Sequence, residues 1–158
     1  MRYFIRKNLR RLSALFILAA IALAGVAADR GSPAEAKVML MKAVAHYRAV
    51  GRHQALADFT AQKPPFRDRD LYVVCIDREL RVSANGAFPD NVYVPADILK
   101  AANGEGVGTV AWRLTGTMGQ AMVRYRWVNP ATHRMEWKIG YFARVGEDVC
   151  GVGVYSPE

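Results

Sequence analysis

Alternating apolar and polar positions in the last third of the chain predict three consecutive antiparallel strands. The strands are expected at residues 122–127, 135–145 and 149–155. Asn-Pro-Ala-Thr at 129–132 and Gly-Glu-Asp at 146–148 have the composition of tight turns. Gly151 and Gly153 leave one side of the last strand bare, so another backbone or a ligand can approach it there.

Helical periodicity dominates the segment before residue 63. Ser32, Pro33 and Glu35 form a capping-box sequence that predicts a helix start. Apolar residues then recur at helical spacing, at Leu40, Met41, Val44 and Tyr47. Gly51 interrupts the pattern, and a shorter helix containing Phe59 follows. The apolar face is expected to pack on a sheet.

The middle of the chain contains shorter predicted elements. The apolar run 71–76 is typical of a central strand, and 80–84 is expected to return beside it. Residues 87–94 are expected to form an exposed loop, and 95–101 one or two helical turns.

Residues 106–118 fit two interpretations. Val107, Val110, Ala111 and Leu114 have helical spacing, whereas 109–114 has the composition of a strand. We favour a helix that crosses back over the sheet. The predicted fold class is therefore α+β, with a long N-terminal helix packed on a five-stranded antiparallel sheet.

The N-terminus has the pattern of a secretory signal. Residues 1–11 contain five basic residues and no acidic one, and residues 12–28 are uncharged and mostly apolar. A cleaved signal peptide is the preferred interpretation, and an uncleaved inner-membrane anchor is the alternative, because 17 residues are near the lower limit for a membrane span. Either way, the rest of the chain is expected in the periplasm.

The signal segment explains most of the net charge of +8. Without residues 1–28 the chain keeps 17 basic and 14 acidic residues, a net charge of +3. The remaining basic residues are interspersed with acids, so we expect no nucleic-acid partner.

Few residues suggest covalent or metal chemistry. Cys75 and Cys150 are an even pair in an oxidising compartment, which suggests a disulfide. His46, His53 and His133 lack metal-ligand spacing, and we interpret the first two as solvent-facing helix residues. The acid pairs Asp68/Asp70 and Glu147/Asp148 flank turns and are interpreted as solvated caps. We expect no enzymatic activity, no cofactor and no metal site.

Several segments in order resemble the single Cache domain, an extracytoplasmic sensor module with a PAS-like sheet. The segments are 43–59 in the helices, Asp70-Leu71-Tyr72 entering the first strand, Tyr125-Arg126-Trp127-Val128-Asn129-Pro130, Lys138 with Tyr141, and 151–155. This resemblance divides the chain into a signal or anchor (1–28), a linker (29–36) and one Cache domain (37–158).

The resemblance implies a sensor of small molecules, often short carboxylates. Lys138 would be the cationic anchor, while Tyr125 and Trp127 share a strand face and would form an apolar wall. The full set of expected ligand-binding residues is Tyr93, Arg113, Tyr125, Trp127, Lys138 and Tyr141. Each also has a purely structural interpretation, as a core aromatic or a solvated surface residue.

The family's strand order also places the first strand beside the last. That order would bring Cys75 near Cys150, either as a disulfide or as two buried thiols. Arg78-Glu79 and Asn85 depart from the family pattern, which there has a glycine and a histidine, so a polar contact at that edge is expected to change. Loop 86–105 matches the family pattern poorly, so the resemblance does not indicate which ligand binds.

Two functions remain open at this stage. The first is a periplasmic ligand-binding or sensing module without its own output domain, which signals through a membrane receptor or sensor kinase. The second is a non-catalytic envelope interaction subunit with a degenerate pocket.

Overall fold

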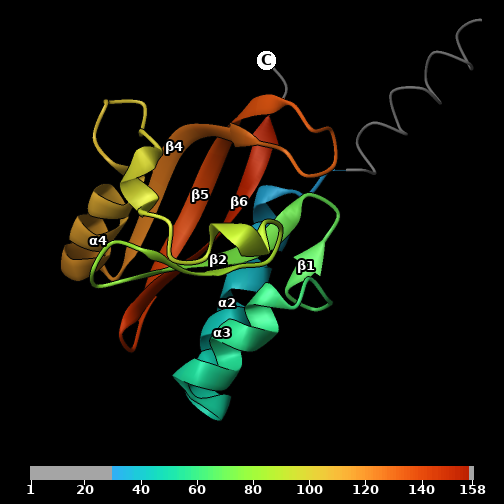
Figure 1. Ribbon diagram of the computed structural model, residues 1–158, viewed down its shortest axis with the longest axis vertical. Helices are drawn as coiled ribbons and strands as arrows, with labels where there is room; N and C mark the ends of the chain where they lie inside the picture. The colour runs from blue at the N-terminus through green and yellow to red at the C-terminus, as the bar shows by residue number, and fades with distance from the viewer. Residues whose placement is uncertain (1–29, 157–158) are drawn as a thin grey trace, which may run out of the picture. The chain divides into compact units, whose positions relative to one another are not determined.

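A computed structural model describes residues 30–156, which form an α+β unit as expected (Figure 1). The helices are α2 (Pro33–Val50), α3 (Arg52–Thr60) and α4 (Val107–Met118), with short 3-10 turns η1 (Pro89–Asn91) and η2 (Ala96–Ile98). The strands are β1 (Arg67–Asp68), β2 (Leu71–Asp77), β3 (Val82–Asn85), β4 (Gln120–Val128), β5 (Met135–Val145) and β6 (Asp148–Ser156). The predicted signal or anchor segment lies outside the described residues.

All strand pairs in the sheet are antiparallel. The order is β1-β2-β6-β5-β4, and β3 pairs with β2. The five predicted strands are all present. The sixth, β1, has two residues, which is too short for any alternation to reveal it in the sequence.

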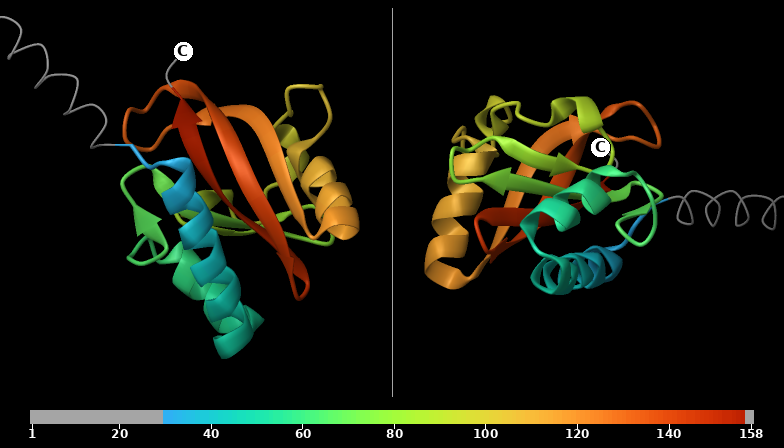
Figure 2. Two further views of the ribbon diagram at one scale, coloured as in Figure 1. Left: turned by 180° about the vertical axis from the view of Figure 1, so that it is seen from behind. Right: turned by 60° about the horizontal axis from the view of Figure 1, so that its bottom comes forward.

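Helix α2 covers one face of the sheet (Figure 2). Its start is as predicted, because the Ser32 hydroxyl accepts from the Glu35 N–H while the Glu35 carboxylate accepts from the Ser32 N–H. Residues 33–36, which the predicted domain division assigned to a linker, form the first turn of this helix. Ala36 and Ala43 are fully buried against the sheet.

Helix α4 and the connections between β3 and α4 cover the other face. The ambiguous segment 106–118 is the helix we favoured, and it buries Val107, Val110 and Ala111. Gly119 has a left-handed backbone (φ 73°) and turns the chain into β4. The sheet therefore separates two apolar cores.

The disulfide joins the two central strands. Cys75 in β2 lies directly opposite Cys150 in β6, with their Cα atoms 4.0 Å apart and the sulfurs bonded. The bond confirms the interpretation as a bridge rather than two thiols. It links the middle of the chain to its last strand across a separation of 75 residues.

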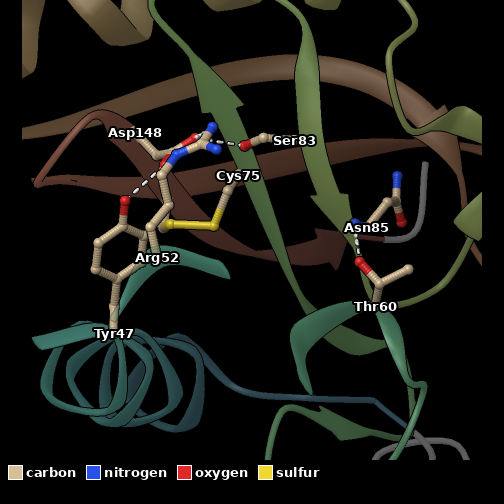
Figure 3. Close-up of a disulfide and its surroundings, with 8 residues drawn as sticks. Tyr47, Arg52, Thr60, Cys75, Ser83, Asn85 and Asp148 are labelled. Carbon is tan, nitrogen blue, oxygen red and sulfur yellow. Dashed lines mark hydrogen bonds and ion pairs between the residues drawn. A yellow bond between two sulfur atoms is a disulfide. The ribbon is translucent and has the colours of Figure 1, made fainter. Parts of the chain in front are cut away.

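Asp148 corrects one of the acid-pair interpretations. Glu147 is exposed as expected, but Asp148 is fully buried. Its carboxylate accepts hydrogen bonds from the Tyr47 hydroxyl (2.7 Å), the Arg52 guanidinium (2.8 and 3.1 Å) and the Ser83 hydroxyl (2.6 Å) (Figure 3). These donors come from α2, α3 and β3, so one carboxylate ties both helices and the β2–β3 hairpin to the sheet.

His46 is only partly solvent-facing, with 28% of its side chain exposed, while His53 is exposed as expected. The His46 ring lies 4.9 Å from the Phe66 ring, and its Nε2 is 2.6 Å from the Asp58 carboxylate. Helix periodicity did not show this, because Phe66 comes from the segment after α3. No helix within residues 30–156 is long and apolar enough to cross a membrane.

We predict that Asp148→Ala lowers the free energy of unfolding by about 3 kcal/mol, because two buried hydroxyls and a guanidinium lose their acceptor. Arg52 is 41% exposed, so its charge stays partly solvated and the loss stays below that of a fully buried pair. Urea unfolding is the measurement. Glu147→Ala, at the exposed neighbouring position, is the control, and equal effects of the two substitutions would contradict the account.

Candidate functional site

A small cavity lies on the sheet face opposite α2. Its volume is about 50 Å³. Its walls are mostly apolar and come from the sheet, the loop before α4 and α4 itself. They include Tyr72, Asn85, Val94, Leu99, Val107, Tyr125, Trp127 and Phe142.

Strand register brings the aromatic and basic side chains of this face together. Tyr125 in β4 pairs with Lys138 in β5, which pairs with Tyr155 in β6. Gly140 and Gly153 make room for them. A Cβ at Gly140 would lie 3.2 Å from the Tyr125 ring, and one at Gly153 would lie 2.4 Å from the Lys138 chain. The space predicted beside Gly153 is thus filled by Lys138 rather than by another backbone.

Lys138 is 1% exposed, and its ammonium is enclosed by aromatic rings. Its Nζ lies 3.8 Å from the Tyr72 ring centre and 4.5 Å from that of Tyr155. One hydrogen bond, to the Tyr155 hydroxyl at 3.3 Å, uses one of its three donors. Burial lowers the pKa of Lys138 to about 7, while the charge of Asp70 acts in the opposite direction.

Tyr155 organises the hydroxyl groups beside Lys138. Its hydroxyl donates to the Val128 carbonyl at 2.8 Å, so its oxygen accepts from Lys138 and from the Tyr72 hydroxyl at 3.2 Å. Burial raises the pKa of Tyr72, Tyr125 and Tyr155. All three hydroxyls therefore stay protonated at neutral pH and can donate hydrogen bonds.

The Tyr125 hydroxyl differs from the other two. Tyr125 is 4% exposed and lines the cavity, yet no hydrogen bond reaches its hydroxyl from any residue between 30 and 156. The Tyr125 hydroxyl is not fully enclosed, so it can meet water or a ligand in the cavity that Tyr125 lines. It is therefore available as a donor to a molecule bound there.

A second group of buried polar residues lies at the end of the strands. Asp70 is fully buried, which contradicts its interpretation as a solvated cap, whereas Asp68 is exposed as expected. Asp70 accepts from the Gly31 N–H at 2.7 Å and from Asn129 Nδ2 at 3.4 Å. Asn129 also donates to Glu136 at 3.0 Å. This group fixes the β4–β5 turn and supplies negative charge near Lys138.

The predicted site residues lie in different places. Tyr125 and Trp127 line the cavity, as expected. Lys138 lies on the same face with its ammonium against the Tyr72 ring, and it is not part of the cavity wall. Tyr141 points to the opposite face, where Lys37 of α2 lies 5.0 Å above its ring.

Tyr93 and Arg113 do not reach the cavity. Tyr93 is 73% exposed, and Arg113 on α4 forms an exposed ion pair with Glu105 at 3.0 Å. Each was assigned from a loop or helix whose orientation the sequence did not fix. The sequence analysis also left out Tyr72, although it lies two residues after Asp70 in a matched segment. Its side chain is on the cavity face of β2, like those of Val74 and Ile76.

Asn85 lies at the cavity edge where the family pattern differs. Its side-chain oxygen accepts from the N–H groups of Ala87 and Phe88 at 3.1 and 2.9 Å. The loop so formed places Phe88 edge-on to Tyr72 and Trp127, at 6.0 and 5.8 Å between ring centres. The polar side chain at this edge therefore shapes the turn that sets Phe88 against two residues of the cavity wall.

No family model matches the sequence, and no curated protein matches it either. The solved structures that are similar in fold include three chemotaxis or chemosensory proteins. A methyl-accepting chemotaxis protein from Vibrio parahaemolyticus superposes with a TM-score of 0.62 and 19% identity, covering 77% of this chain and 86% of that chain. A periplasmic sensor domain of a chemotaxis protein gives 0.56 and 18%, covering 90% and 98%.

The third structure is a Cache chemosensory domain described for its recognition of a carboxylic acid. It gives a TM-score of 0.56 and 18% identity, covering 96% of this chain and 98% of that chain. These likenesses show that the chain has the fold of a single Cache sensor domain, as the resemblance of the sequence implied.

We predict that Lys138 makes stability depend on pH. Between pH 7 and 10 the unfolded Lys138 keeps a proton that the folded one releases, so the free energy of unfolding rises with pH, on the order of 1 kcal/mol per unit. In the Lys138→Met variant the free energy of unfolding should no longer rise with pH in this way. In Lys37→Met, which changes an exposed position, the rise should remain. Chemical unfolding at several pH values measures the slope, and identical slopes in all three proteins would refute the burial argument.

Proposed function

We propose that this protein is a periplasmic sensor module that binds a small organic acid in the cavity beside Tyr125. The observation that carries the proposal is a cavity-lining hydroxyl without a protein partner, on the residue that pairs across the strands with the buried Lys138. The Tyr125 hydroxyl has no hydrogen-bond partner within the described part of the chain. Lys138, which pairs with Tyr125 across β4 and β5, is buried and has one hydrogen bond, to Tyr155. An anion that entered would find both a donor and a compensating charge.

Electrostatics favours an anionic ligand. A buried ammonium with a single hydrogen bond is costly, which is why the pKa of Lys138 falls to about 7. A carboxylate close to it restores the favourable pairing and pulls the pKa of Lys138 upward. Lys138 lies against the Tyr72 ring and outside the cavity wall, so in this proposal its charge acts on the ligand through space.

Cavity size and lining favour a short ligand. About 50 Å³ leaves room for only a few heavy atoms, and Phe142, Val107 and Leu99 offer no polar partner. The ligand that fits is a small carboxylate with a short alkyl body. The carboxylic acid recognised by the third solved structure supports this class.

The fold and the expected signal segment support a sensory role outside the cytoplasm. The structures similar to this chain include a periplasmic sensor domain, and none is described as an enzyme. In our proposal the bound state is communicated to a membrane receptor or sensor kinase, without catalysis or cofactor.

The small size of the cavity also favours a second candidate. Asn85 lines the cavity at the place where the sequence departs from the family pattern, which fits an envelope interaction subunit whose pocket no longer binds a ligand. Ligand binding separates the two candidates.

We predict that short carboxylates such as acetate and propionate raise the melting temperature in a saturable way, because a ligand of the native state stabilises it. Tyr125→Phe should weaken the affinity about 5- to 10-fold, through loss of one hydrogen bond, and Lys138→Met should abolish binding. Calorimetric titration gives the affinities.

Tyr141→Phe is the matched control, since it removes the same hydroxyl from the opposite sheet face. Equal losses in Tyr125→Phe and Tyr141→Phe would show that the cavity is not the site. A well-folded protein that binds no carboxylate would favour the interaction subunit.

A further inference from the structure

One part of the sheet face beside α2 has no covering element within residues 30–156. In the left view of Figure 2, α2 crosses the sheet, and the ribbons of β5 and β4 beside it are open. The open strip forms a groove with a volume of about 510 Å³, roughly ten times the volume of the cavity described above. We call it the α2–β5 groove, lined by Lys37, Met41, Val44, Arg48, Gln120 and Tyr141.

Exposed apolar side chains lie in the groove and next to it on β4. Met41 is 72% exposed, and Met122, which pairs with Tyr141 across β4 and β5, is 64% exposed. Contiguous exposed apolar side chains mark interaction sites, and methionine adapts its shape to a partner.

The groove has cations on both flanks and no carboxylate. Lys37 and Arg48 lie on the α2 flank, while Arg124 follows the lining residue Gln120 on the same face of β4, beyond the groove lining itself. No acidic residue lines the groove, and Lys37, Arg48 and Arg124 have no carboxylate partner within the described residues. The one acid of α2, Glu35, belongs to the other flank, where it pairs with Arg69 at 2.6 Å.

Aromatic rings hold two of these cations in place. The Arg124 guanidinium lies 4.0 Å from the Trp137 ring centre, and the Lys37 ammonium lies 5.0 Å from that of Tyr141. Stacking orders a long side chain in advance of binding, so less entropy is lost when a partner arrives.

We propose that the α2–β5 groove is a docking site for an acidic amphipathic helix of a partner protein. A helix there would complete the layer that α2 begins on this sheet face. Its apolar stripe would contact Met41, Met122 and Tyr141, and acidic residues on both of its flanks would face the two cation rows. The proposal is independent of what the cavity binds.

Charge and shape argue against other occupants. A second copy of the chain would set Lys37 and Arg48 against the same cations. Residues 1–28 contain five basic residues and no acidic one, so they are also mismatched. A bilayer surface favours a protruding apolar face, whereas the apolar residues here line a hollow.

The test uses the full chain in detergent and two fluorescent 18-residue helical peptides. Both carry leucine at helical spacing, one with glutamate on its flanks and the other with lysine. Anisotropy should show saturable binding of the glutamate peptide only. Lys37→Glu and Arg124→Glu should each weaken it about 10-fold, because like charges then face each other.

Lys42→Glu is the matched control, since Lys42 is exposed on the same helix but lines the other flank of α2. It should change the affinity less than about 2-fold. The triple variant Lys37→Glu, Arg48→Glu, Arg124→Glu should bind the lysine peptide instead. Met122→Gln should weaken binding of the glutamate peptide without changing carboxylate binding in the cavity.

Several results would overturn the proposal. They are absence of glutamate-peptide binding, equal binding of both peptides, and equal losses in Lys42→Glu and Lys37→Glu. Binding to vesicles with anionic lipids in place of the peptide would assign the groove to a membrane. Self-association in sedimentation that Arg124→Glu abolishes would assign it to a second copy.

Discussion

The pairing of β2 with β6 is the constraint on which the site depends. It joins a strand from the middle of the chain to the last strand, and the Cys75–Cys150 bond fixes the register of that pairing. Since side chains alternate along each strand, this register puts Tyr72 on the cavity face beside Tyr155. A slip by one residue would turn Tyr72 toward α2 and remove one wall of the Lys138 enclosure.

Local patterns were enough to predict much of this architecture. The Ser32–Glu35 capping box gave the start of α2, and alternation gave β4, β5 and β6. Strand parity alone also predicted that Tyr125 and Trp127 share a face. The disulfide needed the strand order of the family, because residues 75 positions apart have no local signal.

The sequence did not predict the contacts between residues of different helices, strands and loops. Asp70 and Asp148 look like turn acids in sequence, yet each is buried by donors from distant segments. Parity could have excluded Tyr141, because it is three residues from Lys138 on the same strand and must face the other way. The predicted positions of Tyr93 and Arg113 depended on the orientation of loop 86–105 and of α4. No pattern in the sequence indicates that orientation.

The central claim is that a buried ammonium beside the cavity responds to an anionic ligand. Nuclear magnetic resonance of the lysine ¹³Cε signals, assigned with Lys138→Met, measures the pKa of Lys138 directly. The account predicts a pKa of about 7 without ligand and a clearly higher pKa with saturating short carboxylate. A pKa of Lys138 near 10.5 in the free protein, or one that no carboxylate changes, would contradict it.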